Sequence, residues 1–243
     1  MACLNAHFLP VRPERSRRPR CLWAIIAAMI LAVSTAAAEV PAYVREALAT
    51  FNPEVPPDWA YTVMIEHDGH RTTERFDPSR VPEEQWSLLL MEGRGPTADE
   101  RTKYFKYKAA QAPGAMQATF HRNDIEPGTI ELAREGPEAS EFTCGFRAES
   151  ANSDKMLAHL RLHLFIARHQ ARVEKFSLEL REPYSPVLGV KMRELRVEMN
   201  FAPSGADRPA LPVQSSSHFS GRIFLIPVEE NLRYVYSDFL CVH

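Results

Sequence analysis

The chain has 243 residues, of which 45% are hydrophobic and 25% are charged, and its formal net charge at neutral pH is −2. This length is sufficient for one substantial domain with its own hydrophobic core. The mildly acidic balance excludes binding of nucleic acid through a general excess of cations, so we expect no nucleic-acid partner.

The first 38 residues have the three parts of a secretory signal peptide. A segment with five arginines precedes an apolar run over residues 22–33, and Ala36 and Ala38 form an A-x-A cleavage site. The run is shorter than the about 20 residues that a membrane-spanning helix needs. We therefore predict cleavage after Ala38, a periplasmic or secreted protein, and a single domain over residues 39–243. An uncleaved anchor and a twin-arginine signal are the alternatives.

Cleavage would remove five arginines and one glutamate, which changes the net charge from −2 to −6. Two cysteines would remain, Cys144 and Cys241, each in a strand-like segment. In an oxidising compartment they could form a disulfide across neighbouring strands, or they could stay free as small buried apolar residues. The sequence leaves both outcomes open. It contains no C-x-x-C motif, so a thioredoxin-type redox role is not expected.

The first elements after the signal are a helix and a β-hairpin. Residues 41–51 have apolar residues at helical spacing, and the proline at position 53 follows them. Residues 59–66 and 71–76 predict two strands. The Asp68-Gly69 pair between them is a strong hairpin signal, because both positions tolerate positive φ.

A third strand is predicted over residues 85–91, and a helix over 97–110. Thr97 and Glu100 have the spacing of a capping box, in which each side chain accepts a hydrogen bond from the other residue's backbone N–H. This stretch also contains Trp86, Arg94 and Asp99, which together could form a site. The helix start explains Thr97, Asp99 and Glu100 without one.

The remaining chain is rich in predicted strands. After a loosely ordered segment over 112–124, strands are expected over 128–134 and 141–148, with a helical turn or loop over 150–157. Strict alternation of apolar and polar residues then predicts three long strands that share one solvated face. A loop over 204–217 precedes two last strands. The three long strands cover residues 160–166, 176–181 and 195–201, and the last two cover 223–228 and 233–240.

These elements predict an α+β, mainly β fold: a curved antiparallel sheet, or half-barrel, with a few helices as a lid. A continuous apolar face must be covered. Because helical segments are scarce, we predict an apolar hollow between sheet and lid. The alternative is an interior filled by side chains.

The order of elements resembles the LolA-like half-barrel of periplasmic lipoprotein carriers, over most of the chain after the signal. Residues 210–239, ALPVQSSSHFSGRIFLIPVEENLRYVYSDF, are similar to the end of those proteins, and residues 86–97 are similar to a segment that recurs in uncharacterised bacterial secreted proteins. The resemblance implies a hollow for an apolar ligand. The arginine that helps to control closure of the carriers' cavity has no identified counterpart among Arg71, Arg75 and Arg94.

We therefore predict a non-enzymatic carrier or binding protein for an acyl chain or another apolar group, without catalytic residues, metal or cofactor. An envelope protein partner and transient contact with a membrane are compatible with this role. The predicted lining consists of apolar residues on the strand faces: Trp59, Tyr61, Trp86, Leu88, Leu162, Leu164, Leu178, Leu180, Val197, Met199, Ile223 and Leu225.

Two other functions remain open. The first is a structural or interaction module of the cell envelope, with a filled core and a sheet edge that binds a partner. The second is a metal-dependent enzyme with a site at His67, Asp68 and His70, because zinc binds imidazole and carboxylate. The sequence spacing ties no ligand from another segment to this hairpin tip. The sequence also contains no G-x-S-x-G elbow, phosphate loop or dinucleotide motif.

Overall fold

The computed structural model describes residues 40–110, 120–203 and 209–242. The predicted signal peptide and its cleavage site lie outside these residues, as do parts of the segments 112–124 and 204–217. The strands are β1 (Trp59–His67), β2 (His70–Phe76), β3 (Trp86–Met91), β4 (Glu131–Arg134), β5 (Ala139–Cys144), β6 (Leu160–Ala167), β7 (Arg172–Leu180), β8 (Val190–Phe201), β9 (Pro212–Ile223) and β10 (Ile226–Cys241). The α-helices are α2 (Ala42–Thr50), α3 (Ala98–Ala110) and α4 (Ala148–Ser153).

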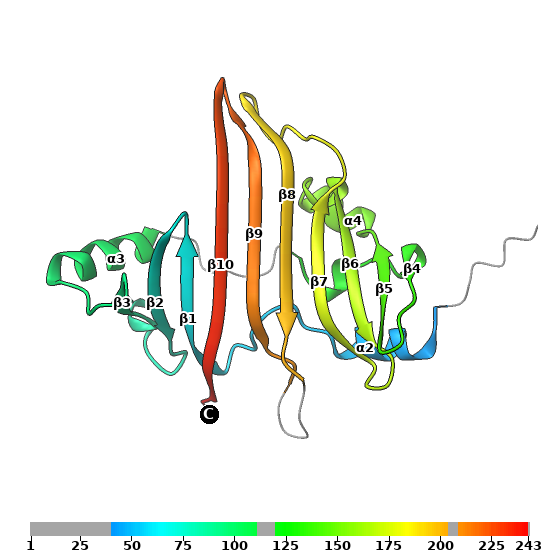
Figure 1. Ribbon diagram of the computed structural model, residues 1–243, viewed down its shortest axis with the longest axis horizontal. Coiled ribbons are helices and arrows are strands. Elements are labelled where there is room, and N and C mark those ends of the chain that lie inside the picture. Colours follow the sequence, from blue (N-terminus) through cyan, green and yellow to red (C-terminus); the bar gives the residue numbers. More distant parts are fainter. Residues whose placement is uncertain (1–39, 111–119, 204–208, 243) are drawn as a thin grey trace, which may run out of the picture. The chain divides into compact units, whose positions relative to one another are not determined.

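The strands form one curved antiparallel sheet that does not close into a barrel, which confirms the predicted fold class (Figure 1). Its order is β3-β2-β1-β10-β9-β8-β7-β6-β5-β4. Every neighbouring pair is consecutive along the chain except β1 and β10. This one non-local pairing joins the N-terminal three strands to the C-terminal meander of seven.

One row of directly opposed residues crosses all the strands and identifies the apolar face. Opposed residues point to the same side of a sheet. The row is Met91, Thr72, Ile65, Tyr234, Ser215, Met199, Phe176, Leu164, Phe142 and Leu132. Both long helices lie on this side: α2 packs on β7, and Tyr104 of α3 donates a hydrogen bond to Glu74, two residues from Thr72.

The opposite face is solvated, as the alternation predicts. Its side chains form ion pairs across the strands. Glu198 of β8 lies 3.0 Å from the Lys175 ammonium of β7 and 2.6 Å from the guanidinium of Arg196. His163 of β6 lies 3.0 Å from the carboxylate of Glu141 on β5. Partly exposed pairs of this kind contribute less to stability than the burial of the apolar face.

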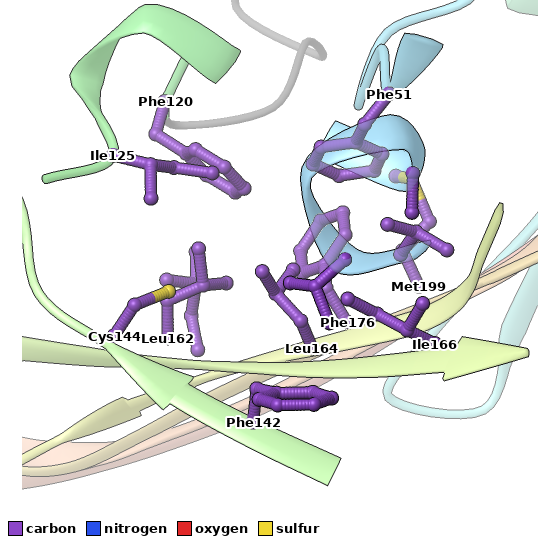
Figure 2. Packing of buried hydrophobic residues seen from close by; sticks show 14 of the residues in the cluster. Phe51, Phe120, Ile125, Phe142, Cys144, Leu162, Leu164, Ile166, Phe176 and Met199 are labelled. Carbon is purple, nitrogen blue, oxygen red and sulfur yellow. The ribbon is translucent and has the colours of Figure 1, made fainter. Parts of the chain in front are cut away.

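The hydrophobic core lies between α2 and strands β5 to β8 (Figure 2). Val44 and Ala47 of α2 are fully buried, as are Leu162 and Leu164 of β6. The ring of Phe120 closes the core from a separate segment, 5.2 Å from the Phe176 ring centroid in an edge-on contact. This half of the apolar face is therefore filled by protein side chains.

The predicted loop over 204–217 and the single strand over 223–228 are wrong. Strand β9 begins at Pro212, and residues 223–228 contain the turn between β9 and β10. The serine-rich sequence of β9 has low strand propensity, but β9 lies in the interior of the sheet and its backbone is paired on both sides, with β8 and β10. Pairing and position override intrinsic propensity in such a strand.

The predicted capping box of α3 is confirmed. Thr97 N–H donates to the Glu100 carboxylate at 2.7 Å, and Glu100 N–H donates to the Thr97 hydroxyl at 3.3 Å. Arg94 binds the same carboxylate through both terminal nitrogens, at 2.9 and 2.6 Å. These bonds, led by the one from Arg94, lower the pKa of Glu100 to about 2. Arg94 and Glu100 therefore have a structural role at this corner.

The two cysteines are not neighbours. Cys144 on β5 and Cys241 on β10 are separated in the sheet by four strands, so they do not form a disulfide with each other. Cys144 is buried on the apolar face, and burial raises the pKa of its thiol to about 12.

We therefore expect unequal reactivity of the two thiols at pH 8. The Cys144 thiol stays protonated and enclosed in the folded chain, and only the thiolate is a good nucleophile. A disulfide reagent such as DTNB should release one equivalent from a folded chain that begins at Glu39, and a second only after denaturant is added. Rapid release of two equivalents without denaturant would contradict the burial of Cys144.

Candidate functional site

The structure separates the predicted ligand-lining residues into three groups. The first group belongs to the core beneath α2 or packs against it: Leu162, Leu164, Leu178, Leu180, Val197 and Met199. Three of these, Leu162, Leu164 and Leu178, are at most 1% exposed. They contact protein side chains on the apolar side and offer no surface to a ligand in this conformation.

The second group lies at the turn of the β9–β10 hairpin. Ile223 ends β9 with 44% of its surface exposed, and Leu225 lies in the turn itself with 87% exposed. Neither residue lines an interior. Sequence reasoning assigned them to a strand face because the turn contains no glycine, proline or asparagine to mark it.

The third group surrounds Tyr61 on the apolar face of β1 to β3. The Tyr61 ring centroid lies 5.3 Å from Phe76, 6.0 Å from Trp86, 5.8 Å from Tyr236 and 5.9 Å from Phe239. We call Tyr61, Phe76, Trp86, Tyr236 and Phe239 the aromatic cluster. Trp59 begins the same strand two residues before Tyr61, and Leu88 is buried on β3 opposite Glu74.

The rings of the aromatic cluster are half-buried rather than enclosed. Desolvation, together with the negative charge of Glu74, raises the pKa of Tyr61. Desolvation also raises the pKa of Tyr236, with a smaller contribution from Tyr61. Both hydroxyls therefore stay neutral at physiological pH, and the cluster presents apolar ring surface with uncharged polar tips.

A buried ion pair fixes α3 beside this cluster. The Lys108 ammonium lies 2.7 Å from the Glu74 carboxylate, and the two side chains are 9% and 6% exposed. The Tyr104 hydroxyl donates to the same carboxylate at 3.1 Å. Lys108 also lies over the Trp86 ring, 4.1 Å from its centroid, which is a cation–π contact. The position of α3 on the apolar face therefore depends on a charged group of β2.

Among the described residues, the helices on the apolar face lie toward its two ends. Helix α2 contacts β7 and helix α3 contacts β3, toward opposite ends of the sheet. Between these ends, Ser217 and Phe219 of β9 and Tyr234 of β10 are half-buried on the same face. The aromatic cluster thus borders a strip of partly exposed side chains.

A polar groove lies on the opposite, solvated face, with a volume of about 660 Å³. It runs over β1, β8, β9 and β10 and the β1–β2 turn, and its lining includes Glu66, Arg196, Glu198, His218, Asn231 and Arg233. These groups bind one another: Arg196 pairs with Glu198, and His218 Nδ1 lies 2.9 Å from Asn231 Oδ1. Such mutual pairing is typical of a solvated sheet face and requires no ligand.

The histidines of the β1–β2 hairpin do not converge on one point. His67 lies 3.3 Å from Asp68 and 3.0 Å from Glu230, whereas His70 binds Glu92 of the β3 turn at 3.1 Å. Within residues 40–110, 120–203 and 209–242, no three metal-binding side chains are grouped for a metal ion. His163 binds Glu141 on the solvated face.

Comparison with known proteins adds no assignment. No family model matches this sequence, and no curated protein or solved structure matches it. The resemblance to LolA-like carriers therefore stays a prediction. Over the part of the chain that the structure describes, no helix has the length and hydrophobicity to cross a membrane.

The sequence predicts Tyr61, Trp86 and Leu88 as lining residues, but it does not predict their neighbours Phe76 and Tyr236. Phe76 and Tyr236 lie on strands that the sequence predicts, and alternation places each on one face of its strand. No local signal pairs β1 with β10, and this pairing brings Tyr236 to Tyr61. Glu74 and Lys108 appear in the sequence as ordinary surface charges.

Proposed function

We propose that this protein is an exported, non-enzymatic carrier or binding protein that holds a lipid-like apolar group at the aromatic cluster. The observation that carries the proposal is the exposure of this cluster. Its five rings lie on the apolar face of the sheet, where a monomeric fold would enclose them, yet they are only half-buried.

The physical reason is the free energy of transfer. Burial of an acyl chain contributes about 0.8 kcal/mol for each CH2 group removed from water. Half-buried rings supply flat apolar surface for such a chain at low cost in side-chain entropy. The hydroxyls of Tyr61 and Tyr236 are neutral, and the charges of Lys108 and Glu74 beside the cluster are buried and paired with each other, so an apolar ligand would not have to desolvate an unpaired charge there.

Two sequence features support an exported carrier. The signal-peptide pattern of residues 1–38 would direct the chain to the periplasm or outside the cell. The resemblance to periplasmic lipoprotein carriers agrees with an open sheet that has helices on its apolar face. In this proposal α3, held by the Glu74–Lys108 pair, forms one wall of the site.

The alternative function is an envelope interaction module, and two observations favour it. The core beneath α2 is filled, since Leu162, Leu164 and Ile166 are fully buried. The edge strand β4 is exposed along its whole length, and among the described strands it pairs with β5 alone. An exposed edge can accept an added strand from a partner. Ligand binding by the purified chain discriminates between the two functions.

We expect a delipidated chain that begins at Glu39 to bind cis-parinaric acid with saturation, and the variant Tyr236→Ser to bind it at least about tenfold more weakly. Loss of one large apolar side chain from a binding surface costs about 1.5–3 kcal/mol. Binding is measured as fluorescence enhancement of the probe. A second signal is energy transfer from tryptophan to the probe. In a Trp59→Phe background of the same chain, this transfer comes from Trp86 and reports a probe bound at the cluster.

The matched control is Phe165→Ser. Phe165 is a half-buried aromatic residue of β6 that lies on the solvated face beneath Lys175, so its loss should leave probe affinity unchanged. Thermal unfolding of both variants verifies that they are folded. A well-folded wild-type chain without saturable binding would reject the carrier and leave the interaction module. Equal affinity in both variants would place the ligand elsewhere.

A further inference from the structure

The β9–β10 hairpin ends in an exposed apolar surface that the proposed ligand site does not use. It combines the hairpin turn with the loop between β7 and β8, and we call it the apolar tip. Its residues are Val187, Leu188, Ile223, Phe224, Leu225 and Ile226. Leu188 is 99% exposed and Leu225 is 87% exposed. Figure 1 shows that β8, β9 and β10 reach well beyond β1 on one side and β7 on the other, so the tip projects from the sheet.

The turn itself is unusual for a hairpin. Two-residue hairpin turns favour asparagine and glycine, because they require positive φ. Here Phe224 occupies the turn with φ +55°, a conformation that is uncommon for a bulky residue and costs free energy. Large apolar side chains therefore stand at the position where folding alone would favour small or polar ones.

The two loops of the tip are joined by contact. Phe224 N–H donates to the carbonyl of Gly189, and the Phe224 ring lies over this glycine. A Cβ atom at Gly189 would lie 2.7 Å from the ring, and Gly189 has φ +85°. The absence of a side chain at position 189 lets the β7–β8 loop hold the ring, so Leu188 and Leu225 project from one joined surface.

Two basic residues lie next to the apolar tip, at the first pair of strand residues behind it. Val190 lies opposite Ile223, and the following pair is Lys191 opposite Arg222. Within the described residues, neither Lys191 nor Arg222 makes an ion pair. The nearest acidic residues on these strands are Glu194 of β8 and Glu229 of β10. They lie farther from the turn, where both pair with Ser220 of the intervening strand β9. From its end, the hairpin is therefore first apolar and then positively charged.

We infer that the apolar tip docks on the surface of a lipid bilayer that contains anionic headgroups. Side chains almost fully exposed on a projecting turn enter the boundary between headgroups and acyl chains without a complementary pocket, whereas a protein partner must supply one. Lys191 and Arg222 would then lie at headgroup level, where basic residues are attracted to anionic lipid.

Docking is independent of ligand binding at the aromatic cluster. Ile226 and Tyr236 are ten residues apart on β10, which corresponds to about 33 Å along a strand. Substitutions at the tip should therefore change membrane binding and leave parinaric acid affinity unchanged. The two proposals can fail separately.

The test is co-sedimentation of the chain that begins at Glu39 with large vesicles of phosphatidylcholine, with and without 30% phosphatidylglycerol. This chain contains all of the described residues, which lie between Val40 and Val242. We expect binding to the anionic vesicles that weakens at high salt. The partition coefficient of the double variant Leu188→Glu/Leu225→Glu should be at least tenfold lower than that of the wild-type chain. The double variant Lys191→Glu/Arg222→Glu should lose binding to the anionic vesicles, and its binding to pure phosphatidylcholine should not change.

The matched control is Leu132→Glu, an exposed leucine on edge strand β4 that is 54% exposed. It should bind vesicles like the wild-type chain. Insertion is measured with a nitrobenzoxadiazole dye on Leu225→Cys in a Cys241→Ser background, whose emission should shift to shorter wavelength on anionic vesicles. Equal vesicle binding by wild type and tip variants, or none by either, would overturn the inference. Dissociation of a wild-type dimer by the tip variants, without vesicle binding, would assign the tip to a second copy of the chain instead.

Discussion

Replacing Phe176 by alanine should lower the free energy of unfolding by about 3–5 kcal/mol, one of the two largest single-residue effects that we expect in this protein. Phe176 is 1% exposed at the centre of the core beneath α2. Its ring centroid lies 5.2 Å from Phe120, 6.2 Å from Phe51 and 6.0 Å from Phe201. Figure 2 shows Phe176 with Phe51 and Phe120.

The size of the effect follows from how these neighbours are held. Phe51 comes from the end of α2, Phe120 from a separate segment and Phe201 from the end of β8, so three chain segments meet on one ring. They cannot move together to fill the space that alanine leaves, because each is fixed by its own backbone. The cost therefore contains a cavity term in addition to the lost transfer free energy.

The measurement is urea unfolding followed by circular dichroism, with Phe165→Ala as the control. Phe165 is also a phenylalanine of a long strand but lies half-buried on the solvated face, and its loss should cost about 1 kcal/mol. Comparable losses in the two variants would show that the core beneath α2 is not the main source of stability.

Replacing Lys108 by alanine should destabilise the fold by a similar amount, about 3–5 kcal/mol at pH 7. The substitution leaves the Glu74 carboxylate buried on the apolar face, where the Tyr104 hydroxyl at 3.1 Å and the Thr72 hydroxyl at 3.5 Å are neutral donors that do not balance its charge. An uncompensated buried charge costs far more than the pair contributes when it is intact. Loss of the cation–π contact with Trp86 adds to the effect.

The same helix provides the control. Lys103 pairs with Asp99 one helical turn away at 2.8 Å, but the two side chains are 75% and 74% exposed. Lys103→Ala should therefore change the free energy of unfolding by less than about 0.5 kcal/mol. The double variant Glu74→Gln/Lys108→Met removes both charges and should recover most of the stability lost in Lys108→Ala. A double variant as unstable as Lys108→Ala would show that packing, and not charge, dominates at this position.

These two predictions concern different halves of the apolar face. Phe176→Ala opens the filled half beneath α2, whereas Lys108→Ala releases α3 from the half that contains the aromatic cluster. If the cluster binds an apolar ligand, Lys108→Ala should also weaken probe binding, while Phe176→Ala should not. Stability and probe affinity measured on the same variants thus test the division of the apolar face into a core and a site.

Local sequence signals determined much of the architecture. Alternation of apolar and polar residues predicted β6, β7 and β8, because the side-chain period of a strand is two and one face of this sheet is solvated. The Asp68-Gly69 pair predicted the β1–β2 turn, and both residues have positive φ. Thr97 and Glu100 predicted the start of α3. In each case the interacting residues are adjacent or a few positions apart.

Only the tertiary structure decided which residues share a place on the apolar face. The pairing of β1 with β10 connects residues more than 160 positions apart, and it assembles the aromatic cluster. Packing by α2 placed Leu162, Leu164 and Leu178 in the core, although alternation alone made them as eligible for ligand contact as Tyr61. Pairing also made the serine-rich β9 a central strand and left Leu225 in a turn. Strand register and helix docking depend on the summed burial of distant residues, which no local pattern contains.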